Sequence, residues 1–492
     1  MEGQTRSRAR AGVAIAMCVA GRSSGPRRLR KDYWPHYRGV ERFLQGVLLV
    51  SLVRILEISQ ISPPQGSIPP TSLPLTFFDV IWLYSPPVER LFFYSFPYPT
   101  SHFIDSFLPT LKSSLSATLQ SFYPLAGNLR RRSADAENFD IVYVDGDAIN
   151  FTVAEYDDDD DFPELCRALH EKSRGDKLHY LVAIQATLFP ERGIAIGISV
   201  HHAACDGTTS MSFMSSWASA CRLRIHQSIA SPPQPQPPPL IDRTLISDPN
   251  GFYSIFFNDL LSMDDFEFAK TSNYAASSDI VLSSFTLTQD HIRSLKKLVM
   301  AKAEEKKASF HCSTIVVAFA YSWIGFCQAR GVKNKKVVHF IFPVDFRKRI
   351  KPSLPEVYFG NCVGPSFVEL DVAKTFEEEE DGIFIAAEAV GRAIEGLSDG
   401  LQGAERWLEK AKSIASNLPM SAAGSPKFRV YDVDFGWGRP AKVEVVSISE
   451  TGAISMAESR GDGGIEIGLA LPKHQMECFE NYFTSGLKNL VE

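Results

Sequence analysis

The sequence predicts a protein of two α/β domains, and three observations lead to this prediction. The chain has 492 residues, which is too long for one ordinary domain and suits two of about 200 residues each. Segments with helical spacing and segments with strand-like alternation are mixed along the chain, without a regular strand–helix–strand repeat. Residues 231–240 include six prolines, so this central stretch predicts an extended linker between the domains.

In the first half of the chain, the hydrophobic pattern predicts helices and strands in alternation. Apolar residues recur with helical spacing over 103–119, and the Pro and Gly of 122–129 then break this helix into a turn. Residues 140–144 look like a strand. Residues 194–200 alternate branched with small side chains, which is the period-two pattern of a strand. Threonines after this strand can begin a helix over 208–218.

The second half predicts a similar mixture of elements. Branched and aromatic runs favour strands, and runs with apolar residues every three or four positions favour helices. We expect strands at 280–287, 338–344, 443–448, 453–456 and 465–471, and helices at 290–306, 314–329 and around Phe479, Phe483 and Leu487.

Composition excludes several classes of protein. A net charge of −6 argues against a dedicated nucleic-acid binder. The eight cysteines form no CxxC pair and no zinc-type spacing, so we expect reduced thiols in a cytoplasmic protein and no metal site. No segment reaches the ~18 consecutive apolar residues of a membrane span, so we expect no membrane partner.

The first fifty residues differ from the rest of the chain. They contain nine arginines but only three acidic residues, and this arginine-rich, acid-poor composition is typical of an organelle transit peptide. A non-native extension from a mis-assigned start codon is the alternative. In both interpretations we expect residues 1–52 to have no role in the chemistry.

The strand expected at 194–200 leads directly into the sequence His-His-Ala-Ala-Cys-Asp-Gly at 201–207. A histidine in a tight turn at a strand end can project into a crevice, and its pKa near neutrality allows it to take a proton from an alcohol. Asp206, with Gly207 behind it, can brace the turn rather than touch substrate. The pattern alone also fits a histidine that only hydrogen-bonds the end of a strand.

A second short segment, Asp-Phe-Gly-Trp-Gly at 434–438, is followed by Arg439 and Pro440. Its glycines allow a sharp backbone path, and Asp434 can pair with a nearby arginine. We interpret this segment as a rigid structural turn, because nothing about the residue type makes Asp434 catalytic.

These two segments, in this order and about 230 residues apart, resemble the BAHD acyltransferases of plants. A third segment resembles the signature of the branch that acylates anthocyanin and flavonoid glucosides. It consists of Tyr358, Phe359, Gly360, Asn361 and Cys362.

The resemblance implies two domains of similar fold, related to chloramphenicol acetyltransferase, with mixed sheets and a solvent channel between them. On this basis we expect an N-terminal domain at 53–228 with the first motif, a crossover linker at 229–250, and a C-terminal domain at 251–492 with the 434–438 motif. Residues 1–52 have no counterpart in the family.

The resemblance also implies a mechanism that uses neither a metal nor a bound cofactor, with acyl-CoA as co-substrate. His202 is implied as the general base in mid-channel. Asp206 is implied to point away from the substrate and to pair with an arginine, for which Arg347 is our candidate. Trp437 and the backbone near it are our candidate donors to the oxyanion. We expect a monomer.

The CoA contacts and the acyl group are implied by the same resemblance. Ser313 and Thr314 match positions that contact CoA in the malonyl-using branch, and their plain alternative is a helix N-cap. We favour malonyl-CoA as donor and a sugar hydroxyl of an anthocyanin, flavonoid or other phenolic glucoside as acceptor. Arg174 and Arg192 are candidate partners for the malonyl carboxylate.

Three alternatives stay open at this point. Hydroxycinnamoyl-CoA is used by some members of the same branch. A condensation-type enzyme shares the histidine motif but takes its acyl group from a carrier protein, and this chain has no adjoining carrier domain. The chain can also be an inactive relative that serves as a binding protein.

Overall fold

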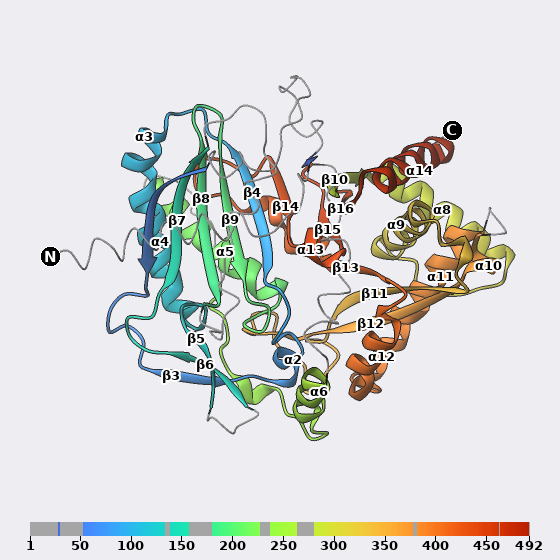
Figure 1. Ribbon diagram of the computed structural model, residues 1–492, viewed down its shortest axis with the longest axis horizontal. Helices are drawn as coiled ribbons and strands as arrows, with labels where there is room; N and C mark the ends of the chain where they lie inside the picture. The colour runs from blue at the N-terminus through green and yellow to red at the C-terminus, as the bar shows by residue number, and fades with distance from the viewer. Residues whose placement is uncertain are drawn as a thin grey trace.

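The computed structural model describes residues 28–29, 53–132, 138–156, 180–226, 237–262, 280–376, 381–461 and 463–491. Most of the extension at 1–52, the proline-rich residues 231–236 and Arg174 lie outside these ranges. The described strands form one sheet in each half of the molecule and a smaller third sheet (Figure 1).

The sheet of the first half has six strands, and all its neighbours are antiparallel except β7 and β8. Helices α4 (Leu108–Ser121) and α5 (Gly207–Ile225) pack against each other beside this sheet (Figure 1). The indole N–H of Trp217 on α5 donates to the Leu111 carbonyl of α4 over 3.1 Å. In order across the sheet, the strands are β14 (Lys442–Val445), β4 (Val88–Ser95), β9 (Gly193–Val200), β8 (Val182–Phe189), β7 (Ile149–Tyr156) and β2 (Val53–Ile61).

The sheet of the second half has seven strands, and a group of helices centred on one apolar helix lies beside it (Figure 1). That helix, α9 (Thr314–Arg330), is buried almost all round, as expected for a helix without a polar face. It packs against α8 (Gln289–Glu305), α11 (Gly382–Glu395) and α14 (Lys473–Val491). The strand order is β1 (Arg28–Leu29), β10 (Ile280–Leu287), β16 (Ile465–Pro472), β15 (Ile454–Glu458), β13 (Met420–Gly424), β11 (Val337–Asp345) and β12 (Val363–Asp371).

The third sheet and the short helices complete the described fold. The three-stranded sheet has the order β3 (Thr71–Pro74), β6 (Phe139–Tyr143) and β5 (Asn128–Arg131). The remaining helical elements are α2 (Phe77–Val80), α3 (Thr100–His102), η3 (Phe103–Phe107), η4 (Tyr123–Ala126), η6 (Arg243–Leu245), α6 (Phe252–Leu261), η8 (Val332–Asn334), α10 (Val372–Phe376), η9 (Gly396–Asp399), η10 (Ala404–Arg406), α12 (Trp407–Ala415), η11 (Pro426–Phe428), η12 (Val430–Asp432) and α13 (Ile448–Thr451).

One strand joins the sheet of the opposite half. β14 comes from the C-terminal half of the sequence but pairs antiparallel with β4, with Val445 opposite Arg90. The strand predicted at 443–448 is therefore too long, because β14 ends at Val445 and α13 begins at Ile448. The strand predicted at 280–287 is confirmed by β10.

Two further points concern the helices. The first predicted helix begins as a π-helix, η3, before it continues as α4, so its apolar spacing is not one regular α-helix. In the part of the chain that the structure describes, none of the helices combines the length and the apolar character needed to cross a bilayer.

Candidate active site

The turn at 201–206 connects β9 to α5 and places His202 at the end of the first sheet. At its start, the His201 amide donates to the Leu181 carbonyl over 2.8 Å. At its end, the Asp206 carboxylate accepts the Thr209 amide over 3.0 Å and so caps α5. Both ends of the turn are thus fixed, and His202 lies between them as a half-buried side chain.

Asp206 forms a buried ion pair with Arg347, as the sequence analysis predicted. The guanidinium donates to both carboxylate oxygens, over 2.7 and 3.2 Å, and each side chain is only 1% exposed. Burial alone would lower the pKa of Arg347, but the Asp206 carboxylate raises it above the ordinary arginine value. The Asp206 carboxylate is fully engaged in this pair and in the helix cap, so it supports the turn.

The segment 358–362 is bound to the same ion pair. Arg347 also donates to the Tyr358 and Gly360 carbonyls, over 3.3 and 3.4 Å, and the Cys362 amide donates to Asp206 over 3.1 Å. Gly360 has φ +132°, and a Cβ there would lie 1.9 Å from an Arg243 nitrogen. Only glycine fits this position, which brings the rest of the segment against the His202 turn.

Asn361 contacts the His202 ring directly. Its amide nitrogen donates to the Asp79 carboxylate over 3.0 Å and to the His202 carbonyl over 2.8 Å. Since both amide N–H groups are used, the amide oxygen must face His202 Nδ1, 3.2 Å away. Nδ1 therefore carries the proton, and Nε2 keeps the lone pair that a general base needs.

Behind Asn361 lies a second buried ion pair. Asp79 accepts the Thr76 amide and hydroxyl over 2.8 and 2.7 Å, and its carboxylate lies 3.2 Å from Arg243. Arg243 also donates to the Tyr358 hydroxyl over 3.1 Å. The side chains of Asp79 and Arg243 are at most 3% exposed, so Asn361 is held on a fixed support.

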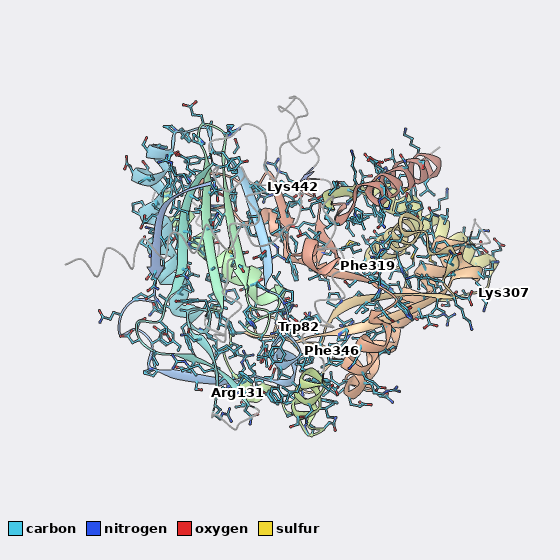
Figure 2. The ribbon with its side chains drawn as sticks, in the orientation of Figure 1. Trp82, Arg131, Lys307, Phe319, Phe346 and Lys442 are labelled. Atoms are coloured by element: carbon cyan, nitrogen blue, oxygen red, sulfur yellow. The ribbon has the colours of Figure 1, made fainter. Side chains whose placement is uncertain are left out.

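Trp82 forms one wall of the site. Its indole stacks on the His202 imidazole with the ring centres 4.0 Å apart and the planes 12° from parallel. Burial lowers the pKa of His202 below its ordinary value, against the opposing effects of its own backbone, Asp206 and Asn361. The ring is therefore neutral at pH 7. Trp82 and Phe346 mark this region between the two halves (Figure 2).

These contacts arrange one neutral imidazole for proton transfer. Its Nδ1 is occupied, its face is covered by Trp82, and the ring is partly accessible. Such a group can accept a proton from a hydroxyl that attacks a carbonyl. Among the described residues no group of three His, Cys, Asp or Glu side chains is arranged to hold a metal ion.

The 434–438 turn lies at the opposite end of β4. Val88 of β4 pairs with Val200, next to the His202 turn, whereas Trp437 packs on Phe96 just beyond the far end of the strand, with ring centres 6.2 Å apart. About seven residues separate the two ends, which corresponds to roughly 20 Å. Trp437 cannot reach an oxyanion at His202, and our choice of it as donor is wrong.

Asp434 organises the turn that contains it. Its carboxylate accepts the amides of Gly436 and Gly438 over 2.8 and 3.0 Å. Arg222 lies 3.4 Å away, but this arginine is 35% exposed. Asp434 therefore has the predicted structural contacts, and its arginine partner is partly exposed.

Ser313 and Thr314 lie at the start of α9. Ser313 occupies the N-cap position but makes no capping hydrogen bond with its side chain, so the plain N-cap explanation does not account for it. The Thr314 hydroxyl accepts a hydrogen bond from the Lys296 ammonium over 2.9 Å. A cation and a helix N-terminus thus lie together at these two residues.

Arg192 is far from His202. It lies in the hairpin between β8 and β9, where its guanidinium is 6.0 Å from the Phe189 ring centre, whereas His202 follows the other end of β9. Arg192 is therefore not a partner for a malonyl carboxylate in this site.

Sequence reasoning missed three residues of the site, Asp79, Trp82 and Arg243. One signal was present, because Thr76 and Asp79 have the spacing of a capping box. Nothing in the local sequence indicates that Trp82 stacks on His202 or that Arg243 pairs with Asp79, since these contacts join distant segments.

Comparisons with known proteins agree with this geometry. The profile described as Transferase family matches residues 53–485. Coumaroyl-CoA:anthocyanidin 3-O-glucoside-6''-O-coumaroyltransferase 1 of Arabidopsis thaliana is 35% identical, covering 89% of this chain and 98% of the relative. Malonyl-coenzyme A:anthocyanin 3-O-glucoside-6''-O-malonyltransferase of Dahlia pinnata is 34% identical, with the same coverage of both chains.

Solved structures show the same fold. Vinorine synthase superimposes with a TM-score of 0.59 at 19% identity, covering 89% of this chain and 98% of that one. TRI101 of F. graminearum, complexed with coenzyme A and T-2 mycotoxin, has a TM-score of 0.59 at 15% identity, covering 83% of this chain and 96% of that one. These likenesses confirm the predicted fold class of two α/β domains.

Proposed function

Because this chain belongs to the BAHD acyltransferases of the Transferase family, we propose that it transfers malonyl from malonyl-CoA to a sugar hydroxyl of an anthocyanin, flavonoid or other phenolic glucoside. The coarser activity, acyl-CoA-dependent acyl transfer, follows from membership of the family. The acyl group, the acceptor and the roles of single residues are the proposal.

One observation supports the role of His202 above the others. Its Nδ1 faces an amide oxygen of fixed orientation, so its Nε2 is left as the basic nitrogen. In the proposed reaction, Nε2 takes the proton of the acceptor hydroxyl while the hydroxyl oxygen forms a bond to the thioester carbonyl carbon. The tetrahedral oxyanion then collapses, the carbon–sulfur bond breaks, and the leaving thiolate takes the proton back from His202.

Lys296, Ser313 and Thr314 are the proposed contacts for CoA. The α9 N-terminus presents backbone N–H groups, and the Ser313 hydroxyl makes no capping bond there. Lys296 adds a positive charge 2.9 Å from the Thr314 hydroxyl. Helix N-termini and cations both favour phosphate groups, which supports this position for a phosphate of CoA.

The relatives support two acyl donors. The names of the Dahlia pinnata relative and of phenolic glucoside malonyltransferase 1 of Arabidopsis thaliana specify malonyl, whereas the name of the first relative specifies coumaroyl. The segment 358–362 resembles the branch in which malonyl-CoA is the more frequent donor. We therefore propose malonyl, with hydroxycinnamoyl as the second candidate.

A donor comparison tests this proposal. The kcat/KM values for malonyl-CoA and coumaroyl-CoA are measured with one flavonoid 3-O-glucoside, and we expect malonyl-CoA to be preferred. A coumaroyl preference of about tenfold or more overturns the donor but leaves acyl transfer intact. Absence of transfer from every acyl-CoA, with the glucoside still bound, would instead identify an inactive relative that serves as a binding protein.

We also propose that the enzyme acts as a monomer in the cytoplasm. The six cysteines within the described ranges carry free thiols, which supports a reducing compartment. Sedimentation of the purified chain and the location of a tagged copy in plant cells test the two statements separately.

A further inference from the structure

The described part of the predicted linker runs beside the segment 358–362. The Leu240 amide donates to the Val357 carbonyl over 2.8 Å, and the Leu240 carbonyl accepts the Phe359 amide over 3.0 Å. These backbone hydrogen bonds fix the linker against the segment that also contains Asn361. The predicted linker is therefore part of the structure around the site, in addition to its role as a connector.

Arg243 extends this contact toward the first half of the molecule. It begins η6, which Asp242 caps by accepting the Thr244 amide over 2.9 Å. Arg243 Nη1 donates to the Tyr358 hydroxyl over 3.1 Å and lies 3.2 Å from the Asp79 carboxylate. Burial alone would lower the pKa of Arg243, but the Asp79 carboxylate raises it above the ordinary arginine value. The linker thus supplies a buried cation to a carboxylate of the first half.

A chain of three contacts connects Arg243 to the ring of the candidate base. The first is the Arg243–Asp79 pair at 3.2 Å. In the second, the Asp79 carboxylate accepts the Asn361 side-chain amide over 3.0 Å, and in the third the Asn361 oxygen faces His202 Nδ1 at 3.2 Å. Asp79 and His202 belong to the first half, whereas Asn361 comes from the second half. The partner of the base is therefore held in place only where both halves and the linker are docked together.

The charge of Arg243 matters because an ionised carboxylate can only accept hydrogen bonds. An ionised Asp79 attracts the NH2 end of the Asn361 amide and repels its oxygen end, which favours one orientation of the amide. Without Arg243, the buried carboxylate would be an unpaired charge, and such a group takes up a proton and becomes neutral. A protonated Asp79 can donate to the amide oxygen. A turned amide would present NH2 to His202 Nδ1 and move the ring proton to Nε2, which removes the basic lone pair.

We propose that Arg243 is a positioning residue for the reaction, which keeps His202 in its Nδ1–H form through Asp79 and Asn361. This inference rests on the proposed function, because it takes His202 as the base of acyl transfer. It makes turnover depend on a linker residue that acts on the base through two other side chains.

Removal of the cation, followed by its replacement from solution, tests this role. Arg243→Ala should lower kcat about three- to tenfold, the scale of one hydrogen bond, with little change in the KM for acyl-CoA or acceptor. The effect is partial because the Asn361 amide also donates to the His202 carbonyl, which favours the same orientation. Arg243 lines a cavity of about 260 Å³, so free guanidinium can enter the position of the missing side chain and should restore kcat. Urea, which has a similar shape but no charge, should not restore it.

The tautomer can be measured without turnover. In protein labelled with ¹⁵N-histidine, the shifts of the ring nitrogens distinguish an N–H from a nitrogen with a free lone pair, and the His202→Ala spectrum identifies the signals of His202. We expect the Nδ1–H form in the unmodified chain and a mixture of the two forms in Arg243→Ala. Guanidinium should reverse this change.

A double variant keeps the test available if Arg243→Ala does not fold. Asp79→Asn together with Arg243→Met removes both charges of the pair, which avoids a stranded buried charge. An amide at position 79 can donate as well as accept, so the double variant should show the same mixture of His202 tautomers.

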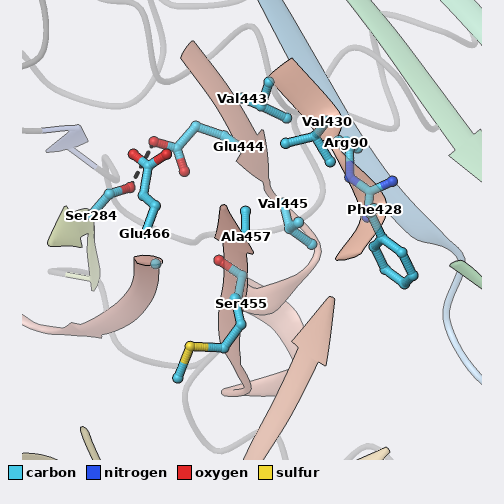
Figure 3. A pocket seen from close by; sticks show the side chains of 12 residues that line it. Arg90, Ser284, Phe428, Val430, Val443, Glu444, Val445, Ser455, Ala457 and Glu466 are labelled. Atoms are coloured by element: carbon cyan, nitrogen blue, oxygen red, sulfur yellow. Dashed lines mark hydrogen bonds between the residues drawn. The ribbon is translucent and has the colours of Figure 1, made fainter. Parts of the chain in front are cut away.

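Arg90→Ala is the matched control. Arg90 is 5% exposed and Arg243 is 6% exposed, so both variants empty the place of a buried arginine. Arg90 lies beside Phe428 where the two large sheets meet (Figure 3), and its Nη1 donates to the Met211 sulfur over 2.9 Å. Arg90→Ala therefore reports the loss of stability alone, and the kcat of the folded protein and the His202 tautomer should stay unchanged.

The outcomes separate the role of Arg243 from the proposed function. An Arg243→Ala variant that keeps both the Nδ1–H form and the unmodified kcat overturns the inference, as does an equal loss of kcat in Arg90→Ala. If the unmodified chain transfers no acyl group, the proposed function fails, and the tautomer measurement still decides the role of Arg243.

Discussion

The turns at 201–207 and 434–438 are both short glycine-containing segments, but the structure holds them in different ways. In the first turn, Asp206 forms an ion pair with Arg347 in which both side chains are 1% exposed. The same turn contacts the segment 358–362 through Asn361 and Cys362. The second is closed by Asp434 on its own backbone, next to a partly exposed arginine. The 434–438 turn is thus the one farther from the candidate base, so a glycine-containing turn is not by itself evidence of closeness to the chemistry.

The largest effect expected from this comparison is the decrease in stability when Asp206 is replaced. Asp206→Ala strands the buried Arg347 and removes the cap of α5, so we expect a loss of about 3–5 kcal/mol in the free energy of unfolding. Urea unfolding of the full chain measures it. A variant that unfolds at the same urea concentration as the unmodified protein would show that the pair does not support the turn.

His202→Ala should lower kcat by at least about 10²-fold, the usual scale for a general base, while the protein stays folded. Release of CoA thiol in steady state measures this loss. The neighbouring His201→Ala is the matched control and should stay within about threefold, because His201 Nδ1 accepts the Ala203 amide within the same turn. An inactive His201 variant beside a normal His202 variant would reverse the assignment.

The pH profile sharpens the same prediction. Burial lowers the pKa of His202, so the imidazole stays neutral as the pH falls through the ordinary histidine value of about 6.5. We expect kcat/KM to hold steady from pH 8 to about 6.5 and to fall only below it, when the base becomes protonated. An acid limb that begins clearly above pH 6.5 would contradict the assignment of this limb to His202.

Asn361→Ala should lower kcat about tenfold, with a smaller change in the KM for acyl-CoA, because the variant no longer selects the Nδ1–H form of His202. Steady-state kinetics and the shape of the pH profile measure the effect. Asn417→Ala is the control, since that amide faces another histidine, His339, at 3.5 Å. If the two variants had equal effects on kcat, Asn361 would not be a positioning residue for His202.

The smallest effect belongs to the second turn. Asp434→Ala removes the acceptor for two backbone amides but strands only a partly exposed arginine. We expect a loss of about 1–2 kcal/mol, and kcat for the folded fraction should be unchanged. Unchanged melting together with abolished chemistry would make Asp434 a direct catalytic residue.

The parts of the molecule that follow from local pattern could be predicted from sequence. Alternation predicted the strand at 194–200 and a branched and aromatic run predicted the strand at 280–287, and they appear as β9 and β10. The partner of Asp206 was chosen from family resemblance rather than from pattern, and the Arg347 pair is present. The role of His202 as base stays a prediction.

The parts that depend on contacts between distant segments could not be predicted. Trp82 stacks on a residue 120 positions away in sequence, and no periodicity encodes such a pair. The prediction for Trp437 failed for the same reason. Trp437 lies beyond one end of β4 and His202 lies near the other end, so the length of this strand separates the two residues. The strand predicted at 443–448 was too long because α13 begins at Ile448, although its apolar run continues.

The pairing of β14 with β4 has a consequence for synthesis on the ribosome. β4 is complete at Ser95, but its outer partner begins only at Lys442, about 350 residues later. At the usual elongation rates of about 5–20 residues per second, this edge of β4 stays unpaired for roughly 20–70 s before β14 is synthesised. During this time an apolar strand with Leu91, Phe92 and Phe93 has one unpaired side. The nascent chain should therefore need shielding by chaperones until the last fifty residues emerge.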